Sequence, residues 1–155
     1  MQLHDRFTRT ALSLFSLIIL GHASAQGGSA TWDLNPATGV WNTATNWTPA
    51  TVPNGPSDVA TFNVSNITAI SLLRSVEVSA IDFTAGASAF TFSVHPNQTL
   101  TIGGAGVSND SGIQQNFETF DPTVTGAGAI VFMNSATAGN GNTYTNRVHP
   151  MVARA

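Results

Sequence analysis

The fold class is decided by residues Val76–Asn109, which read VEVSAIDFTAGASAFTFSVHPNQTLTIGGAGVSN. Three runs in this stretch, VEVSAIDF, AFTFSV and TLTIGG, alternate apolar and polar residues and are separated by breaks rich in Gly, Ala, Ser, Asn and Pro. Alternation with a period of two, bounded by turn-forming residues, is typical of β-strands with one buried face. The stretch therefore predicts several short strands and an all-β fold.

Similar short units recur along the chain at unequal intervals. Ile81-Asp82-Phe83, Leu100-Thr101-Ile102 and Ile130-Val131-Phe132 share an apolar–polar–apolar pattern. Loop insertions between the coils of a β-solenoid produce such spacing, so we predict a β-solenoid. A β-sandwich is the alternative, and its hairpins favour Asn-Gly turns between strands. The two Asn-Gly pairs of this chain, Asn54-Gly55 and Asn140-Gly141, flank the strand runs instead of separating them.

The composition excludes several classes of partner and bond. Of the 155 residues, 42% are hydrophobic and 8% are charged, and both lysine and cysteine are absent. Beyond residue 25, three arginines stand against seven acids, which gives a net charge of −4. Binding to a row of phosphates needs a basic surface, so nucleic acid is not an expected partner. Without cysteine there are no disulfides, and the core and the backbone hydrogen bonds must hold the fold.

The first 25 residues have the pattern of a secretory signal peptide. Arg6 and Arg9 precede the apolar run Ala11–Leu20, and small residues occupy positions 23 and 25. This arrangement predicts cleavage between Ala25 and Gln26 and a protein that acts outside the cytoplasm. A membrane anchor is the competing interpretation. The apolar run is about half the length of roughly 20 residues that a bilayer-spanning helix needs, so no membrane span is expected.

All three tryptophans, Trp32, Trp41 and Trp47, fall within residues 26–62, a region rich in Gly, Pro and Asn. One interpretation is an N-terminal cap, in which broad indole rings cover the apolar end of the stacked strands. The other is a carbohydrate-binding surface, on which the rings stack against pyranose faces. The turn-forming residues between the tryptophans favour the cap, because they do not hold the three rings on one strand face.

The acidic residues do not form a catalytic pattern. Glycoside hydrolysis needs two carboxyl groups across one bond, and Glu77 and Asp82 are expected on opposite faces of a regular strand. No serine lies in a nucleophile-elbow motif. We therefore expect no enzymatic activity, no catalytic residue and no cofactor. The acids considered are Asp33, Asp58, Glu77, Asp82, Asp110, Glu118 and Asp121.

Two features raise the question of metal binding. Gly103–Ser108, GGAGVS, nearly matches the G-G-x-G-x-D motif of calcium-binding β-rolls, but Ser108 stands where the carboxylate is needed and the motif occurs once. A tight glycine corner between two strands explains the same residues. Neither His95 nor His149 has a histidine or cysteine partner at ligand spacing. No metal site is expected.

Several motifs follow one another in a characteristic order. They are W…G-x-W-N-T-A-T-N-W…P…D-x-A-T-F, then V-x-x-I-D-F and L-T-I-G-G-A-G-V-S-N-D-S-G, and finally Q-N-F and V-F-M-N-S-A-T-A-G-N-G-N-T-Y-T-N. Over roughly residues 31 to 147, this order resembles the N-terminal part of bacterial autotransporter-type passenger proteins, which carry autotransporter-associated β-strand repeats. The resemblance implies a right-handed parallel β-helix on the surface of a Gram-negative cell, or secreted from it. It also implies an adhesive or structural role and usually no catalysis.

Together with the leader, the resemblance divides the chain into four parts: a signal peptide at 1–25, a Trp-rich cap at 26–62, solenoid coils at 63–147 and an irregular tail at 148–155. Complete members of the family continue much further, to a translocator barrel or a sorting segment, so a truncated or frameshifted product is expected here. Its last coil would be uncapped and would self-associate through its open end. The implied partner of a full-length form is a glycan or protein of the host or of another cell surface.

Overall fold

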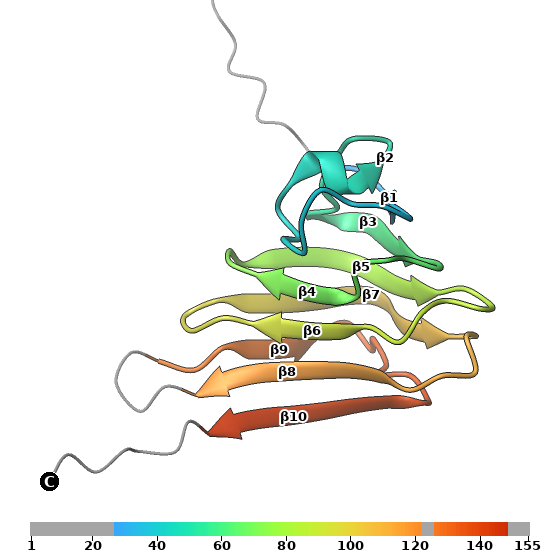
Figure 1. Ribbon diagram of the computed structural model, residues 1–155. Helices are drawn as coiled ribbons and strands as arrows, with labels where there is room; N and C mark the ends of the chain where they lie inside the picture. The colour runs from blue at the N-terminus through green and yellow to red at the C-terminus, as the bar shows by residue number, and fades with distance from the viewer. Residues whose placement is uncertain (1–26, 122–125, 149–155) are drawn as a thin grey trace, which may run out of the picture.

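The computed structural model describes residues 27–121 and 126–148, which form two β-sheets joined by turns (Figure 1). The predicted signal peptide, its cleavage site between Ala25 and Gln26, and the predicted tail beyond Val148 lie outside the described residues. Ten strands and one short 3-10 helix make up the regular structure of the described part. The all-β prediction is confirmed.

The first sheet has six strands in the order β2-β1-β3-β5-β7-β9, and the second has four in the order β10-β8-β6-β4. The strands of the first sheet are β1 Ala30–Trp32, β2 Trp47–Thr48, β3 Gly55–Phe62, β5 Val76–Phe83, β7 Thr99–Asn109 and β9 Ala129–Phe132. Those of the second are β4 Ala69–Leu72, β6 Thr91–Val94, β8 Gln115–Asp121 and β10 Asn142–Val148. The short helix η1, Ala44–Asn46, directly precedes β2.

From β3 to β10, consecutive strands alternate between the two sheets (Figure 1). Each strand therefore pairs with the strand two places away in the chain, and all of these pairs are parallel. A parallel neighbour needs a crossover connection instead of a hairpin, and here each crossover contains a strand of the other sheet. The β-sandwich alternative requires mostly antiparallel pairs, which the described residues show only between β1 and β2.

Apolar side chains form columns between the sheets because the parallel strands pair in register. Phe92, Phe117 and Tyr144 are successive partners in β6, β8 and β10. The ring centroids of Phe92 and Phe117 are 4.7 Å apart, and those of Phe117 and Tyr144 are 4.9 Å apart. These distances match the spacing of about 4.8 Å between paired strands. The first sheet has equivalent columns, in which Val76 aligns with Leu100 and Ile130, and Val78 with Ile102 and Phe132.

The glycine-rich part of β7 interrupts this regular pairing. The register between β5 and β7 shifts between Val78 and Ala80, and Ala80 pairs with Gly106. Gly103–Gly106 therefore lies inside β7 as a bulge, and not at a corner between two strands as expected. Gly106 has a φ of +95°, and a Cβ there would come within 2.4 Å of the carbonyl oxygen of Thr137. A side chain at position 106 would be strained by this φ and would clash with Thr137, so glycine is required there.

The same irregularity changes which side chains of β5 face outward. Ala80 and Ile81 are both buried although they are adjacent, so the alternation shifts by one residue. Glu77 and Asp82 consequently both lie on the outer face of the sheet, and the expectation that they face opposite sides does not hold. That expectation assumed a regular strand.

The N-terminal segment extends each sheet by one short pairing and then folds back. β1 pairs with β3 in the first sheet, and Val40 pairs with Ser71 of β4 in the second. The chain returns through η1 to β2, which pairs antiparallel with β1 and lies at the end of the stack (Figure 1). The predicted cap region, residues 26–62, contains this folded-back segment. It also contains β3, which is paired with β1 on one side and with β5 on the other.

Replacing Phe117 with Ala should lower the free energy of unfolding by about 3–5 kcal/mol, because a fully buried ring is removed from the middle of an aromatic column. Ile113→Ala is the matched control: this side chain is 46% exposed in the turn before β8, and its loss should change stability by less than about 0.5 kcal/mol. Urea denaturation followed by tryptophan fluorescence measures both. Equal midpoints for the two variants would contradict the stacked core.

Candidate functional site

The three tryptophans form one buried cluster at the N-terminal end of the core. Trp32, Trp41 and Trp47 are 1%, 0% and 1% exposed. Trp47 contacts each of the other two indoles edge-on, with ring centroids 5.0 Å apart in both pairs. Each indole N–H donates to a backbone carbonyl, that of Ile67, Pro53 and Trp41 respectively. The rings are therefore buried without leaving a polar group unpaired.

This placement corrects the carbohydrate-stacking interpretation of Trp32, Trp41 and Trp47. Stacking on a pyranose needs an exposed ring face, and none of the three indoles offers one. All three rings instead contact Phe62 of β3 and close the end of the core. The physical reason is the folded-back segment, which turns the rings toward the strands. Their arrangement is the one that the cap interpretation describes.

Three of the carboxylates have side-chain partners within the fold. Asp82 Oδ1 accepts the hydroxyl hydrogen of Ser108 at 2.7 Å, and Glu118 forms an ion pair with Arg147 at 2.8 Å. Asp33 accepts a hydrogen bond from the Thr48 hydroxyl. These contacts link neighbouring strands and give the carboxylates a structural role. Ser108 stands where a calcium motif has its carboxylate. Its hydroxyl group donates a hydrogen bond to Asp82 of the neighbouring strand β5.

No group of three His, Asp or Glu side chains that could hold a metal ion occurs in residues 27–121 and 126–148. The ring of His95 lies beside that of Phe120, with centroids 5.6 Å apart. His149 falls outside the described residues. Of the two histidines considered in the sequence, His95 is the one that the structure describes, and it belongs to no such group there.

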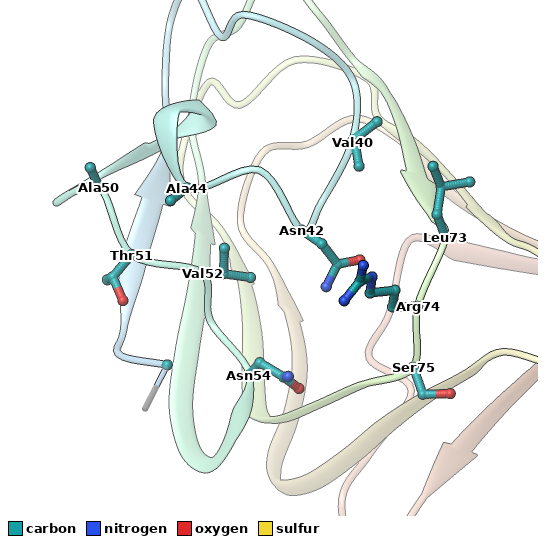
Figure 2. Close-up of a pocket in the computed structure, with 11 residues that line it drawn as sticks. Val40, Asn42, Ala44, Ala50, Thr51, Val52, Asn54, Leu73, Arg74 and Ser75 are labelled. Atoms are coloured by element: carbon teal, nitrogen blue, oxygen red, sulfur yellow. The ribbon is translucent and has the colours of Figure 1, made fainter. Parts of the chain in front are cut away.

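A cavity of about 670 Å³ lies between the folded-back N-terminal segment and the turn that joins β4 to β5 (Figure 2). Its polar side chains include Asn42, Asn54 and Arg74. Apolar side chains form another part of the wall, among them Val52 from the segment after β2 and Leu73 from the turn. The cavity thus forms where two irregular segments meet beside the regular stack.

Arg74 supplies the positive charge of this cavity. Its side chain is exposed and forms no salt bridge within the described residues, whereas Arg147, the other described arginine, is paired with Glu118. Figure 2 shows the Arg74 guanidinium and the Asn42 amide directed toward one another. In a chain without lysine, an uncompensated guanidinium in a cavity is a notable local charge.

The two asparagines of the cavity differ in how their amide groups are used. Asn54 Oδ1 accepts the backbone N–H of Glu77 at 3.0 Å, which orients the side chain. Asn42 Oδ1 is buried, and none of the described residues donates a hydrogen bond to it. A buried acceptor without a donor is costly, so Asn42 is the polar group of this cavity that is not explained by the fold alone.

Sequence reasoning did not identify this cavity. Asn42 and Arg74 are far apart in the chain, and they meet only because Val40 pairs beside β4. The one available signal was the rarity of basic residues: Arg74 is one of three arginines beyond residue 25. Rarity alone did not distinguish it from Arg147.

At the opposite end of the stack, nothing in the described residues covers the core as the tryptophans do. β9 and β10 are each paired on one side only within the described residues, with β7 and β8. Ile130, Phe132 and Tyr144 are partly buried there and line a second cavity of about 430 Å³. Unpaired strand edges beside apolar side chains are a surface onto which a further strand can add.

Comparison of the chain with protein-family models, with curated proteins and with solved structures gives no match. None of the helical structure in the described residues is long and apolar enough to cross a membrane.

Replacing Trp41 with Ala should lower the free energy of unfolding by about 3–5 kcal/mol, since the variant loses a fully buried ring. It also leaves the carbonyl of Pro53 without the indole donor. Leu34→Ala, at a side chain that is 53% exposed in the same region, serves as the control. Thermal and urea unfolding measure both. A stable Trp41→Ala protein that has lost binding to a glycan array would restore the sugar-platform interpretation.

Burial raises the pKa of Tyr144 from 10.0 to about 12. The unfolded chain therefore releases this proton first, so the stabilising effect of the neutral phenol is complete below about pH 10 and is lost as the pH rises toward 12. Tyr144 is the single tyrosine of the chain, so tyrosinate absorbance follows it directly. We expect a higher midpoint in the folded protein than in urea, and equal midpoints would show that the ring is not buried.

Proposed function

We propose that this chain is an exported, non-enzymatic β-solenoid with a structural or adhesive role at the surface of a Gram-negative bacterium or outside it. The observation that carries the proposal is that consecutive strands from β3 to β10 alternate between two sheets, and that the pairs they form within each sheet are parallel. Each strand is packed against its neighbours two places away. Such an architecture grows in one dimension by adding coils, which suits a stalk or a repetitive display surface.

The finer fold proposed is a right-handed parallel β-helix. β3, β5 and β7 are parallel neighbours in one sheet, and each connection between them passes through the second sheet. Crossovers between parallel strands of one sheet are right-handed in about 98% of cases. The in-register columns of Phe92, Phe117 and Tyr144 support a helical repeat, because equivalent side chains recur once per coil.

The outer faces favour a structural or adhesive role over catalysis. Asp82 and Glu118 are engaged with Ser108 and Arg147, and the exposed positions of the second sheet are mostly Thr, Ser and Asn. Polar, sparsely charged and repetitive faces of this kind can contact a glycan or protein over an extended area. The alternative function, carbohydrate binding or processing, loses its main support with the burial of the tryptophans.

Export is tested at the predicted cleavage site. In an expressing Gram-negative bacterium, mass spectrometry of the mature protein should give Gln26 as its first residue, because small residues at positions 23 and 25 form the cleavage pattern. Ala25→Phe should block processing, whereas Ser24→Phe, at the unrestricted position between them, should not. An intact N-terminus on protein recovered outside the cytoplasm would refute this part of the proposal.

Self-association is tested at the open end. We expect the protein to form concentration-dependent oligomers, because β9 and β10 each present an unpaired edge. Val131→Lys places a charge on the outer face of β9, where the side chain is 38% exposed, and should weaken association. Thr101→Lys adds the same charge at the paired position of the inner strand β7 and should not. Analytical ultracentrifugation distinguishes these results, and a monomeric wild type at every concentration would contradict the expectation.

A further inference from the structure

We propose that the cavity around Arg74 binds a small hydroxylated carboxylate, of which a uronic acid is the best-fitting class. The proposal concerns a different surface from the open strand edges and does not depend on the role of the stack. It rests on one unpaired guanidinium, two asparagine side chains with different hydrogen-bonding states, and a wall of mixed polarity.

The guanidinium selects the charge of the ligand. Arg74 lines the cavity and forms no salt bridge within the part of the chain that the structure describes. Its planar fork of N–H donors matches the two oxygens of a carboxylate. No acidic residue is among those that line the cavity, and Asp58, close by, accepts the backbone N–H of Asn54 at 3.0 Å.

The asparagines select hydroxyl groups next to the carboxylate. Asn42 Oδ1 is buried and receives no hydrogen bond from the described residues. A hydroxyl can donate to it, and satisfy a polar group that the fold leaves unpaired, when the exposed Arg74 side chain beside it (Figure 2) turns away toward the carboxylate. Asn54 Oδ1 is already bonded to the Glu77 N–H, which leaves its NH₂ group as a donor to a second hydroxyl. A ligand with one carboxylate and adjacent hydroxyls meets all three side chains.

Size and polarity agree with this class. A volume of about 670 Å³ lies within the range of roughly 300–1,000 Å³ that is usual for small-molecule sites. Val40, Val52 and Leu73 provide small apolar contacts for the C–H faces of a sugar ring. The buried tryptophans take no part, so this site is separate from the sugar platform that the sequence suggested.

The test is a titration of the isotope-labelled protein, as purified from the expressing cell, with three probes followed by NMR. Galacturonate has the carboxylate and the hydroxyls, galactose lacks the carboxylate, and propionate lacks the hydroxyls. We expect galacturonate to shift the side-chain amide signals of Asn42 and Asn54 with saturation. Galactose should give no saturable shift, and propionate should bind more weakly than galacturonate.

Arginine variants identify the charge that binds. Arg74→Gln should weaken galacturonate binding about tenfold or more, because a charge-assisted bidentate contact is lost. Arg74→Lys should retain part of the affinity. Arg147→Gln removes one positive charge at the far end of the stack and should leave binding unchanged. Arg74 is exposed, so both Arg74 variants should keep the wild-type melting temperature.

Each alternative outcome overturns a stated part of the proposal. Equal shifts with galactose and galacturonate would show that no carboxylate is recognised. Equal affinity for propionate would contradict the role of Asn42 and Asn54. Equal losses in Arg74→Gln and Arg147→Gln would assign the binding to net charge instead of to this cavity.

Discussion

The structure depends on the stacking of like side chains in register along the sheets. Because β6, β8 and β10 pair residue for residue, Phe92, Phe117 and Tyr144 lie above one another at the spacing of the backbone itself. Dispersion and hydrophobic burial therefore stabilise the same strand register as the backbone hydrogen bonds. A chain with no cysteine and few charges has no other strong source of stability, and loss of register would remove both contributions together.

A stack of this kind has two ends, and the two ends differ in this chain. At the N-terminal end, Trp32, Trp41 and Trp47 cover the core while their N–H groups bond to backbone carbonyls. At the other end, Ile130 and Phe132 are partly buried beside β9 and β10, each of which has a partner on one side only within the described residues. The two ends therefore differ in how well the core is covered, although β2 at one end and β9 and β10 at the other are each edge strands within the described residues.

The alternation in VEVSAIDF, AFTFSV and TLTIGG predicted the strands correctly, because period-two burial is a local property. The interpretation of Gly103–Gly106 as a corner was wrong for a related reason: turns and bulges both need glycine, and only the pairing with β5 tells them apart. The tryptophans were open to two interpretations because sequence does not show which way a folded-back segment faces. The Arg74 cavity was not predictable at all, since Asn42 reaches it through the tertiary pairing of Val40 with Ser71.

The position of the cavity follows from the same stacking that forms the core. Where strands repeat in register, every inward position is filled by the equivalent side chain of the next strand, and outward polar groups such as Ser108 and Asp82 bond to each other. A regular stack therefore leaves little room for a ligand. Unfilled volume and an unpaired charge can persist only where the chain departs from the repeat. The segment after β2 and the turn before β5 are such departures, and Asn42, Asn54 and Arg74 all lie on or beside them. In this fold the irregular segments are the places where a specific binding function can be added without disturbing the register on which stability depends.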